Sequence, residues 1–551
     1  MIVRIRISRP VVGGSSAGRV TGRAQPRAAW SGSTLVAAGI LVSRISGLLR
    51  ESAIGHFFGV HTVAADAFRG AIRIPNLLNN LFGEGVLSAS FITIYSKLRA
   101  AEQDEEAEHL AETVFGALCL LCAVLVLAGL LLAPYLTRVI VPGFDAERLA
   151  VTIRIVRILF PGTGLLVLSA WCLGVLNSHR HFLLSYIAPV AMNLSMIAVL
   201  LSGRGAATNR LVLYLAWGYV LGSVLQFLVQ VPRVLQILPA FRPALDITAE
   251  PMRLVLRSFV PIFISRGVVQ ISSTVDSIIA SWLPAGSVAA FGYGQVIYLL
   301  PISLFSMSVA AAELPALSGA TGTAEEVAAV LRKRLTAGLR RIAFFVVPSA
   351  VAFLVLGDVV AGAVFQSGRF THSDAQEVWA VLAGASVGLL ASSLGRLYSS
   401  GLYALLDMRT PLRLAFVRLA ITATLGYLFA LPLPRALGID PKWGTAGLTS
   451  SAGIAGWVEF AFLRRAMNRR IGTTGLPIAH AWKLWAAGFA AALPAYGSKL
   501  LVVSAMGPKH PLVMALVALP IYGALYFGIT HAMGMDEARS TIGLITRRFA
   551  R

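Results

Sequence analysis

The sequence predicts an all-α polytopic membrane protein with about fourteen transmembrane helices and a central cavity. Hydrophobic residues make up 57% of the 551 residues and charged residues only 13%, and the mean hydropathy is +0.76. A soluble chain usually carries about 25% charged residues. The apolar runs extend for about 20 residues or more, as transmembrane helices do, whereas an outer-membrane barrel needs short segments of alternating polarity.

About fourteen apolar segments follow one another along the chain. They start near Thr34, Val63, Ala111, Ala150, Phe182, Leu211, Leu254, Ser287, Arg341, Ala375, Leu412, Gly444, Ala481 and Leu512. We divide them into an N-lobe of six helices over residues 33–236, a C-lobe of six helices over 250–470, and two further helices over 479–533.

The two ends of the chain are predicted to be cytoplasmic tails. Residues 1–32 are rich in arginine and contain no apolar core, so we expect a disordered basic tail and no cleaved signal peptide. Residues 534–551 are predicted to form the second tail. With both termini inside, about 27 lysines and arginines fall on the cytoplasmic side and about 8 outside, which supports an even number of spans with both termini in the cytoplasm.

The net charge of +22 mostly reflects this unequal distribution of basic residues. Because they are dispersed between spans and form no single soluble face, we do not expect nucleic-acid binding. The chain has no P-loop, nucleophile-elbow or HExxH motif. We therefore expect a transporter and no enzyme, without cofactor or metal, driven by the membrane potential or an ion gradient.

Two kinds of residue are expected to carry no chemistry. The histidines, His61 among them, mostly lie at span ends or in loops without metal-ligand spacing, so we expect them to be solvated. The three cysteines all lie within apolar spans, which makes structural disulfides unexpected.

A membrane enzyme that acts on lipid-linked sugar would show a sizeable external loop with catalytic side chains, and the predicted outside loops are short.

An internal repeat relates the two lobes. Ser43-Arg44 in the first span is followed about thirty residues later by Pro75, and Ser265-Arg266 in the seventh is followed about thirty-five residues later by Pro301. Duplicated halves are typical of transporters that bind cargo between the halves near the middle of the membrane and rock to alternate access.

Charged residues interrupt the first span. A charge in the middle of a membrane costs about 2.5 to 3.5 kcal/mol, so Arg44, Arg50 and Glu51 must line a protected cavity. Gly47 shares the helical face of Arg44 and Glu51 and would allow close approach of a backbone or a headgroup.

The second span carries a longer polar stripe. Steps of three or four residues separate its members, which are Asp66, Arg69, Arg73, Asn76, Asn80 and Glu84. This spacing keeps them on a single helical face and predicts a polar stripe about 27 Å long. Pro75 lies within this stripe and should bend the helix.

The seventh span supplies a third polar stripe on the opposite lobe. It contains Arg266, Gln270, Ser273 and Ser277, with Asp276 beside it. Arginine suits a diphosphate, since its planar fork makes bidentate charge-assisted hydrogen bonds and stays ionised.

We assign the candidate residues to two roles. The predicted substrate-binding residues are Arg44, Arg50, Arg266, Arg69, Arg73, Asn76 and Asn79. The acids predicted to pair with these cations or to gate the cavity are Glu51, Asp66, Glu84 and Asp276. For Glu51 and Asp66 a purely structural role in helix packing remains open, and so does interfacial placement of Arg69 and Arg73.

Seven motifs in order resemble the MurJ/MviN lipid II flippases of the MOP exporter superfamily. They are SRISGLLRE (43–51), ADAF (65–68), IPNLLNNLFGEG (74–85), VPGF (141–144), APVAMNLSMI (188–197), FQSGRFT (365–371) and YALLDMRTP (403–411). The resemblance implies a fourteen-helix protein of the bacterial inner membrane, with a tail-binding groove on the last two helices. It also implies a cargo, the undecaprenyl-diphosphate-linked peptidoglycan precursor, moved from the cytoplasmic to the periplasmic leaflet, and the cell-wall synthesis machinery as a possible partner.

The chain departs from this family pattern at two places. Asn79 stands where many members have arginine, and Gln295-Val296 stands where many have an Asp-Arg pair. We hypothesise that Arg266 restores one positive group from the opposite lobe. These departures leave two alternatives open: a flippase for another polyprenyl-diphosphate-linked glycan, or a small-molecule exporter of the same superfamily.

Overall fold

The computed structural model describes residues 28–83, 87–318, 323–405, 407–507 and 510–549. Within these ranges the regular elements are all helices, which confirms the all-α prediction. Most of the predicted N-terminal tail and Glu84 lie outside the described residues, and so does the side chain of Arg266.

The N-lobe begins with a long helix and a broken one. Its elements are α1 (Ala28–Phe58), α2 (Val63–Ala71), α3 (Arg73–Phe82), the π-helix η1 (Ser88–Ile92), α5 (Thr93–Ala100), α6 (Asp104–Ile140), α7 (Ala146–Ser178), α8 (Phe182–Ser202) and α9 (Thr208–Ile237). Helix α7 packs against α6 and α9, and α8 packs against α1 and α9.

The C-lobe and the last helices follow. They are α10 (Glu250–Ser281), α11 (Ser287–Pro301), the π-helix η2 (Ile302–Ser306), α12 (Met307–Ser318), α13 (Ala324–Val355), α14 (Gly357–Phe365), α15 (His372–Ala404), α16 (Arg409–Ala430), α17 (Pro432–Ala436), the 3₁₀-helix η3 (Pro441–Trp443), α18 (Gly444–Ile471), α19 (Ile478–Met506), α20 (Pro511–Ala532) and α21 (Asp536–Phe549).

Ten helices among the described residues are long and apolar enough to cross a membrane. The other predicted spans fall on α1, on the broken run from α2 to α5, on α10 and on α18. The total of fourteen crossings stays a prediction. Within the predicted C-terminal tail, α21 is a helix that packs against α13, where Glu537 accepts a 3.0 Å hydrogen bond from Arg340.

The second span is interrupted close to Pro75. Helix α2 ends before Ile72, and α3 restarts at Arg73, so that Pro75 falls in the first turn of α3. In that turn the missing amide hydrogen of proline has no intrahelical partner to lose. In the C-lobe, α11 ends at Pro301 and a π-helix follows. Both lobes therefore interrupt their second helix near the proline that the sequence singles out.

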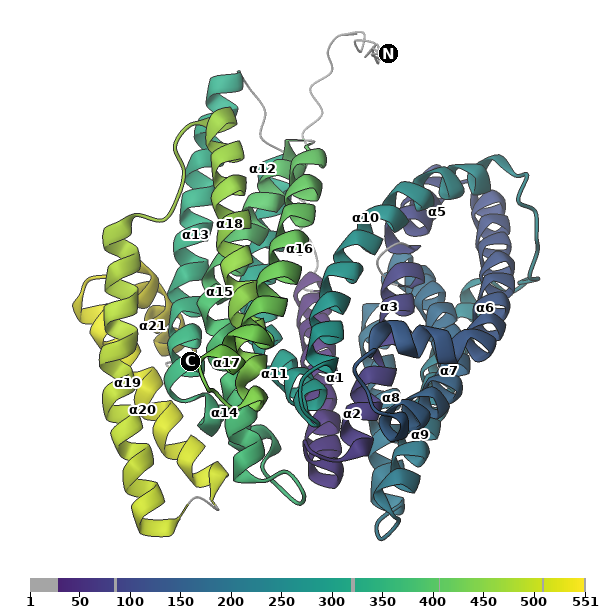
Figure 1. Cartoon of the computed structure of the whole chain (residues 1–551). Coiled ribbons are helices and arrows are strands. Elements are labelled where there is room, and N and C mark those ends of the chain that lie inside the picture. The colour runs from purple at the N-terminus through teal and green to yellow at the C-terminus, as the bar shows by residue number, and fades with distance from the viewer. Residues whose placement is uncertain (1–27, 84–86, 319–322, 406, 508–509, 550–551) are drawn as a thin grey trace.

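The two lobes stand side by side, with α1, α2 and α11 between them (Figure 1). Helix α10 packs against α16 and α11 on one side and against α3, η1, α5 and α6 of the N-lobe on the other. The ring of Phe82 of α3 packs there against Phe259 and Phe263 of α10, with ring centroids 6.4 and 5.0 Å away. The predicted first helix of the C-lobe thus joins the two lobes.

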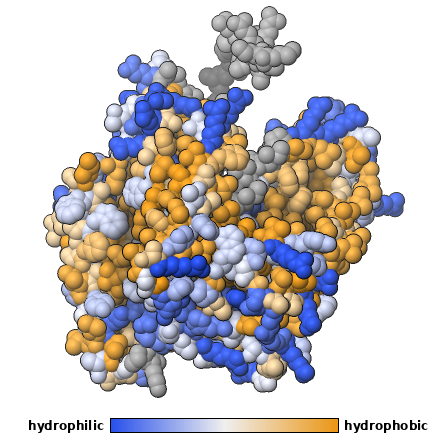
Figure 2. Space-filling model, viewed as in Figure 1, coloured by the Kyte–Doolittle hydropathy of each residue, from blue (hydrophilic) through white to orange (hydrophobic). Residues whose placement is uncertain are grey.

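Hydrophobic side chains cover much of the outer surface. Figure 2 shows them over both lobes, with hydrophilic residues gathered at the upper edge and toward the lower edge. On α6, Leu127 and Leu131 are 60% and 66% exposed, and Leu516 of α20 is 74% exposed. Apolar exposure on this scale is expected where the neighbouring medium is lipid.

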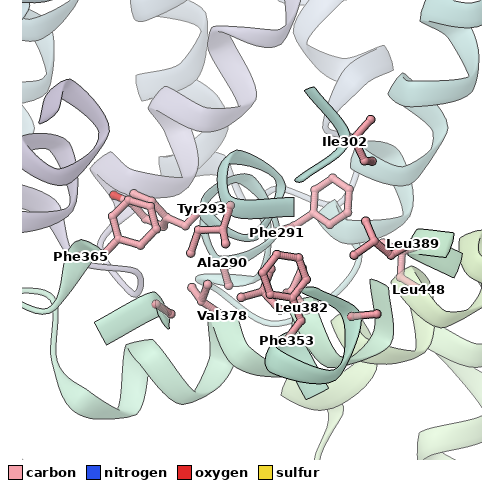
Figure 3. Packing of buried hydrophobic residues seen from close by; sticks show 14 of the residues in the cluster. Ala290, Phe291, Tyr293, Ile302, Phe353, Phe365, Val378, Leu382, Leu389 and Leu448 are labelled. Carbon is pink, nitrogen blue, oxygen red and sulfur yellow. The ribbon is translucent and has the colours of Figure 1, made fainter. Parts of the chain in front are cut away.

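The interior of the C-lobe is closely packed around the first turns of α11. Figure 3 shows Phe291 and Tyr293 of α11 among apolar side chains of α14 and α15, which include Phe365 and Val378. The rings of Tyr293 and Phe365 are 4.9 Å apart. This packing fixes the position of α11, which forms one wall of the cavity described next.

Candidate functional site

A cavity of about 900 Å³ lies between α1, α3, α7 and α8 of the N-lobe and α11 of the C-lobe. Its size falls within the range of about 300 to 1,000 Å³ that is usual for ligand sites. Of the predicted site residues, Arg44, Arg50 and Glu51 line it, and Asn80 of the predicted polar stripe lines it as well.

Arg50 is held at the cavity wall by two neighbours. Its Nη1 donates to Oδ1 of Asn193 at 3.0 Å, and its Nη2 donates to Oε1 of Glu51 at 2.6 Å. The amide of Asn193 donates in turn to Oγ of Ser46 at 2.9 Å. The guanidinium is thus oriented by α8, and its Nε is buried without a hydrogen-bond partner among the described residues.

Glu51 forms ion pairs with two arginines, Arg50 and Arg69. Its Oε2 lies 2.5 Å from Nη2 of Arg69, which sits over the ring of Tyr293 at 4.2 Å. Glu51 and Arg69 are both buried. One carboxylate therefore balances two guanidinium groups, so the cluster of Arg50, Glu51 and Arg69 keeps one net positive charge. Arg69 itself does not line the cavity.

Arg44 is the second arginine on the cavity wall. It is exposed and lines the cavity six residues before Arg50, which places the two Cα atoms about 9 Å apart along α1. Within the described part of the chain, no carboxylate lies within ion-pairing distance of its guanidinium group. Together with the cluster around Glu51, Arg44 gives the cavity an excess of positive charge.

The C-lobe presents an apolar wall. Val296, Leu299 and Leu300 of α11 line the cavity, and Gln295 does not. The sequence predicts cations from both lobes, whereas the described cationic groups of the cavity all come from α1 of the N-lobe. The side chain of Arg266 lies outside the described residues, so the predicted contribution from α10 stays a prediction.

Asp66 joins the lobes away from the cavity. Its Oδ2 accepts from the backbone N–H of Gly286 at 2.7 Å, and its Oδ1 accepts from that of Ala289 at 2.9 Å. Arg148 of α7 lies 3.2 Å from the same carboxylate. A carboxylate on the N-terminus of α11 is favoured by the helix dipole. The predicted pairing acid thus holds α2 against α11.

Arg73, Asp276, Asn76 and Asn79 are described, and they do not line the cavity. Arg73 lies over the ring of Phe291 at 5.4 Å. The carboxylate of Asp276 has a buried oxygen without a hydrogen-bond partner among the described residues. Asn76 is exposed and Asn79 is half-buried. The predicted polar stripe is divided between two helices, α2 and α3, which meet at Ile72.

His61 is exposed, as the sequence predicts, but it also makes contacts that the sequence does not predict. Its Nε2 lies 2.9 Å from Oε1 of Glu377, and its Nδ1 lies 3.2 Å from the carbonyl oxygen of Ala285. Since both ring nitrogens face acceptors, both carry hydrogens. The hydrogen bond to Glu377 raises the pKa of His61 to about 9. No local signal in the sequence predicts this contact, because Glu377 is 316 residues away.

Further hydrogen bonds join the lobes at the same end of the molecule, which carries loops 59–62, 283–286 and 366–371. The backbone N–H of Arg369 donates to the carbonyl of His56 at 2.8 Å, and the hydroxyl of Tyr293 donates to that of Gly59 at 3.3 Å. Gly59 has a φ of +64°, and a Cβ there would lie 2.7 Å from the carbonyl oxygen of Arg369. The close approach of these loops therefore requires glycine.

A search of the described residues for metal sites finds no group of three or more histidine, cysteine or acidic residues that could hold a metal ion. Within the same residues, Cys119, Cys122 and Cys172 are free thiols.

Comparison with known proteins identifies the family. The family model for the lipid II flippase MurJ matches residues 54–517. The probable lipid II flippase MurJ of Bdellovibrio bacteriovorus is 29% identical over 524 residues, which cover 91% of this chain and 94% of the relative. The lipid II flippase MurJ of Burkholderia cenocepacia is 28% identical over 521 residues, covering 90% and 96%.

Solved structures share the fold. A lipid II flippase MurJ in an inward closed conformation has a TM-score of 0.75 at 22% identity, with 91% of this chain and all of that chain covered. An inward-facing multidrug transporter of the MATE family, from the MOP superfamily, has a TM-score of 0.58 at 17% identity, with 78% and 100% covered. From the family match over most of its length, the chain belongs to the MurJ lipid II flippase family.

Proposed function

We propose that this protein flips the undecaprenyl-diphosphate-linked peptidoglycan precursor, lipid II, from the cytoplasmic to the periplasmic leaflet by alternating access. The observation that carries the proposal is the placement of Arg44 and Arg50 on the wall of a cavity of about 900 Å³ inside an apolar helix bundle. Guanidinium groups at this depth are costly unless an anion or water reaches them.

The charge of the cavity favours an anionic cargo. Arg44 has no acidic partner among the described residues, and Glu51 is shared between Arg50 and Arg69. A diphosphate would add the missing negative charge and offers several oxygens to two arginine forks. An exporter of cations would need the opposite balance, so we keep a small-molecule exporter and a flippase for another polyprenyl-linked glycan as alternative outcomes of the test.

The last two helices are proposed to hold the lipid tail. Leu493 and Leu501 of α19 are 74% and 71% exposed, and Leu512 and Leu516 of α20 are 62% and 74% exposed. These side chains offer an apolar surface on which a polyprenyl chain would remain within a hydrocarbon environment.

One end of the molecule, here called the closed end, is where loops of the two lobes contact each other. Such a closed end supports a cycle of alternating access. Lobe contacts through Asp66, His61 and Tyr293 gather at the end that carries loops 59–62 and 283–286. We place this end at the periplasm, because lysine and arginine are concentrated in the opposite loops and tails. A diphosphate that neutralises α1 would lower the repulsion met when the lobes close on the cytoplasmic side.

The proposal includes no catalytic step. Movement of the cargo would draw on the membrane potential or an ion gradient, or on consumption of lipid II outside the cell. Enzymes of cell-wall synthesis are then expected as neighbours in the inner membrane, since they supply and consume this cargo.

The test is rescue of bacteria depleted of their own lipid II flippase. We expect the full chain to restore growth and normal cell shape, and Arg44→Ala to fail at equal membrane expression. Ile45→Ala is the matched control, because Ile45 is 50% exposed and does not line the cavity. Failure of the unaltered chain at good expression would favour another lipid-linked glycan as cargo.

A further inference from the structure

Cations and neutral amides are both among the polar groups that line the cavity. Arg44 and Arg50 of α1 are cations, whereas Asn80 of α3, Asn177 of α7 and Asn193 of α8 are neutral amides. The cations suit phosphate oxygens. An amide carries both donors and an acceptor, which suits neutral hydroxyl and acetamido groups.

The amide of Asn193 is already engaged within the protein. Its oxygen accepts from Arg50 and its nitrogen donates to Ser46. Ser185, which also lines the cavity, donates its hydroxyl to the carbonyl of His181 at 3.4 Å. Each side chain has therefore only part of its hydrogen-bonding capacity left for a ligand.

Asn177 has no such partner. It lies in the last turn of α7, and its Oδ1 is buried without a hydrogen-bond partner among the described residues. Buried polar atoms in native proteins are nearly always satisfied, so an orphan on a cavity wall needs an explanation. An occupant of the cavity that donates a hydrogen bond would provide one when the amide of Asn177, which lines the cavity, turns its Oδ1 toward it.

The chemistry of this atom excludes the diphosphate as its partner. A carboxamide oxygen is an acceptor only. Phosphate oxygens that face two guanidinium groups are acceptors as well, so they would repel Oδ1 of Asn177. If the cargo itself satisfies Oδ1 of Asn177, the group that does so carries an O–H or N–H and is distinct from the anion bound by α1.

We infer that Asn177 is a specificity-determining residue that binds a hydroxyl or acetamido N–H of the sugar attached to the diphosphate, and that Asn80 assists it from α3. This inference rests on the proposed function. It gives the cavity a means of distinguishing the glycosylated lipid from the bare polyprenyl diphosphate, which shares the same diphosphate and tail. The arginines alone would bind both lipids.

The position of Asn177 fits this role. α1 contributes cavity-lining residues from Ile40 to Glu51, and α7 contributes Leu173 and Asn177 to the same cavity. A headgroup that contacts α1 through its phosphates can therefore present its first sugar to α7 and α3, while the apolar wall of α11 closes the remaining side.

The experiment measures binding of lipid II and of undecaprenyl diphosphate to the purified full chain by native mass spectrometry. We expect Asn177→Leu and Asn177→Ala to weaken lipid II binding about 5- to 10-fold, the usual worth of one hydrogen bond, and to leave undecaprenyl diphosphate binding unchanged. Asn209→Ala is the matched control, because Asn209 is an exposed residue in the first turn of α9.

Two outcomes would overturn the inference: equal weakening of both lipids by the Asn177 variants, or no weakening of either. The melting temperature of each variant is measured in parallel, and if Asn177→Leu does not fold, Asn177→Ala decides. Arg44→Ala is expected to weaken both lipids. If Arg44→Ala weakens neither, the proposed function itself fails, which is a result distinct from failure at Asn177.

Discussion

The cavity has two unlike walls. The N-lobe wall carries Arg44, Arg50 and the amides of α3 and α7, whereas the C-lobe wall of α11 carries Val296, Leu299 and Leu300. The difference indicates that one lobe recognises a polar headgroup and the other covers it. A C-lobe wall without charge can approach the N-lobe without the repulsion that a second set of cations would create.

The largest effect on lipid II binding and flipping is expected from removal of Arg44 from the N-lobe wall. Arg44→Ala deletes the cation that has no acidic partner among the described residues, and we expect lipid II binding and flipping in proteoliposomes to fall about 10- to 100-fold. Arg44→Lys should retain part of the activity, since it keeps the charge and loses the bidentate fork. Full activity of Arg44→Ala would show that this cation of the N-lobe wall is not needed for lipid II binding or flipping.

A charge placed on the apolar wall should have the next largest effect. Val296→Asp sets a carboxylate opposite the arginines of α1, where it would compete with the diphosphate, and we expect about 10-fold weaker lipid II binding. Val296→Asn is the matched neutral control and should weaken binding less. Equal effects of the two variants would show that the wall acts by shape and not by charge.

Arg266→Ala tests whether the C-lobe contributes a cation after all. If Arg266 compensates for the two departures from the family pattern, its loss should reduce flipping by a smaller factor than the loss of Arg44, about 3- to 10-fold. The measurement is flipping of lipid II in proteoliposomes with both variants at equal density. Normal flipping by Arg266→Ala would refute the compensation hypothesis.

The smallest effect is expected at the closed end. His61 has a pKa of about 9, raised from 6.5 by Glu377, so its stabilising contribution is complete below pH 6.5 and is lost as the pH rises through about 9. The melting temperature should fall more between pH 7 and pH 10 in the unaltered chain than in His61→Gln. Identical pH profiles would mean that this contact does not stabilise the closed end.

The sequence predicts the fold and part of the site for local reasons. Long apolar runs define the helices, and the cost of burying charge in a membrane is enough to place Arg44, Arg50 and Glu51 of the first run in a cavity. Pro75 likewise predicts an interruption of the second span, and α3 restarts beside it.

The rest depends on contacts that no local pattern encodes. In the second span, Arg69 of α2 pairs with Glu51, whereas Asn80 of α3 lines the cavity. His61 meets Glu377, and Asp66 caps α11, across more than two hundred residues of sequence. Such pairings follow from how the lobes pack, which spacing along one helix does not reveal.

The most direct test of the account is photo-crosslinking of lipid II to α1. A photoreactive amino acid at Ser43, which lines the cavity, is compared with the same group at Ile45 on the outer face of the helix. The account predicts a lipid II adduct at residue 43 that excess unlabelled lipid II removes, and little adduct at residue 45. A strong adduct at residue 45 with none at residue 43 would contradict a headgroup path through this cavity.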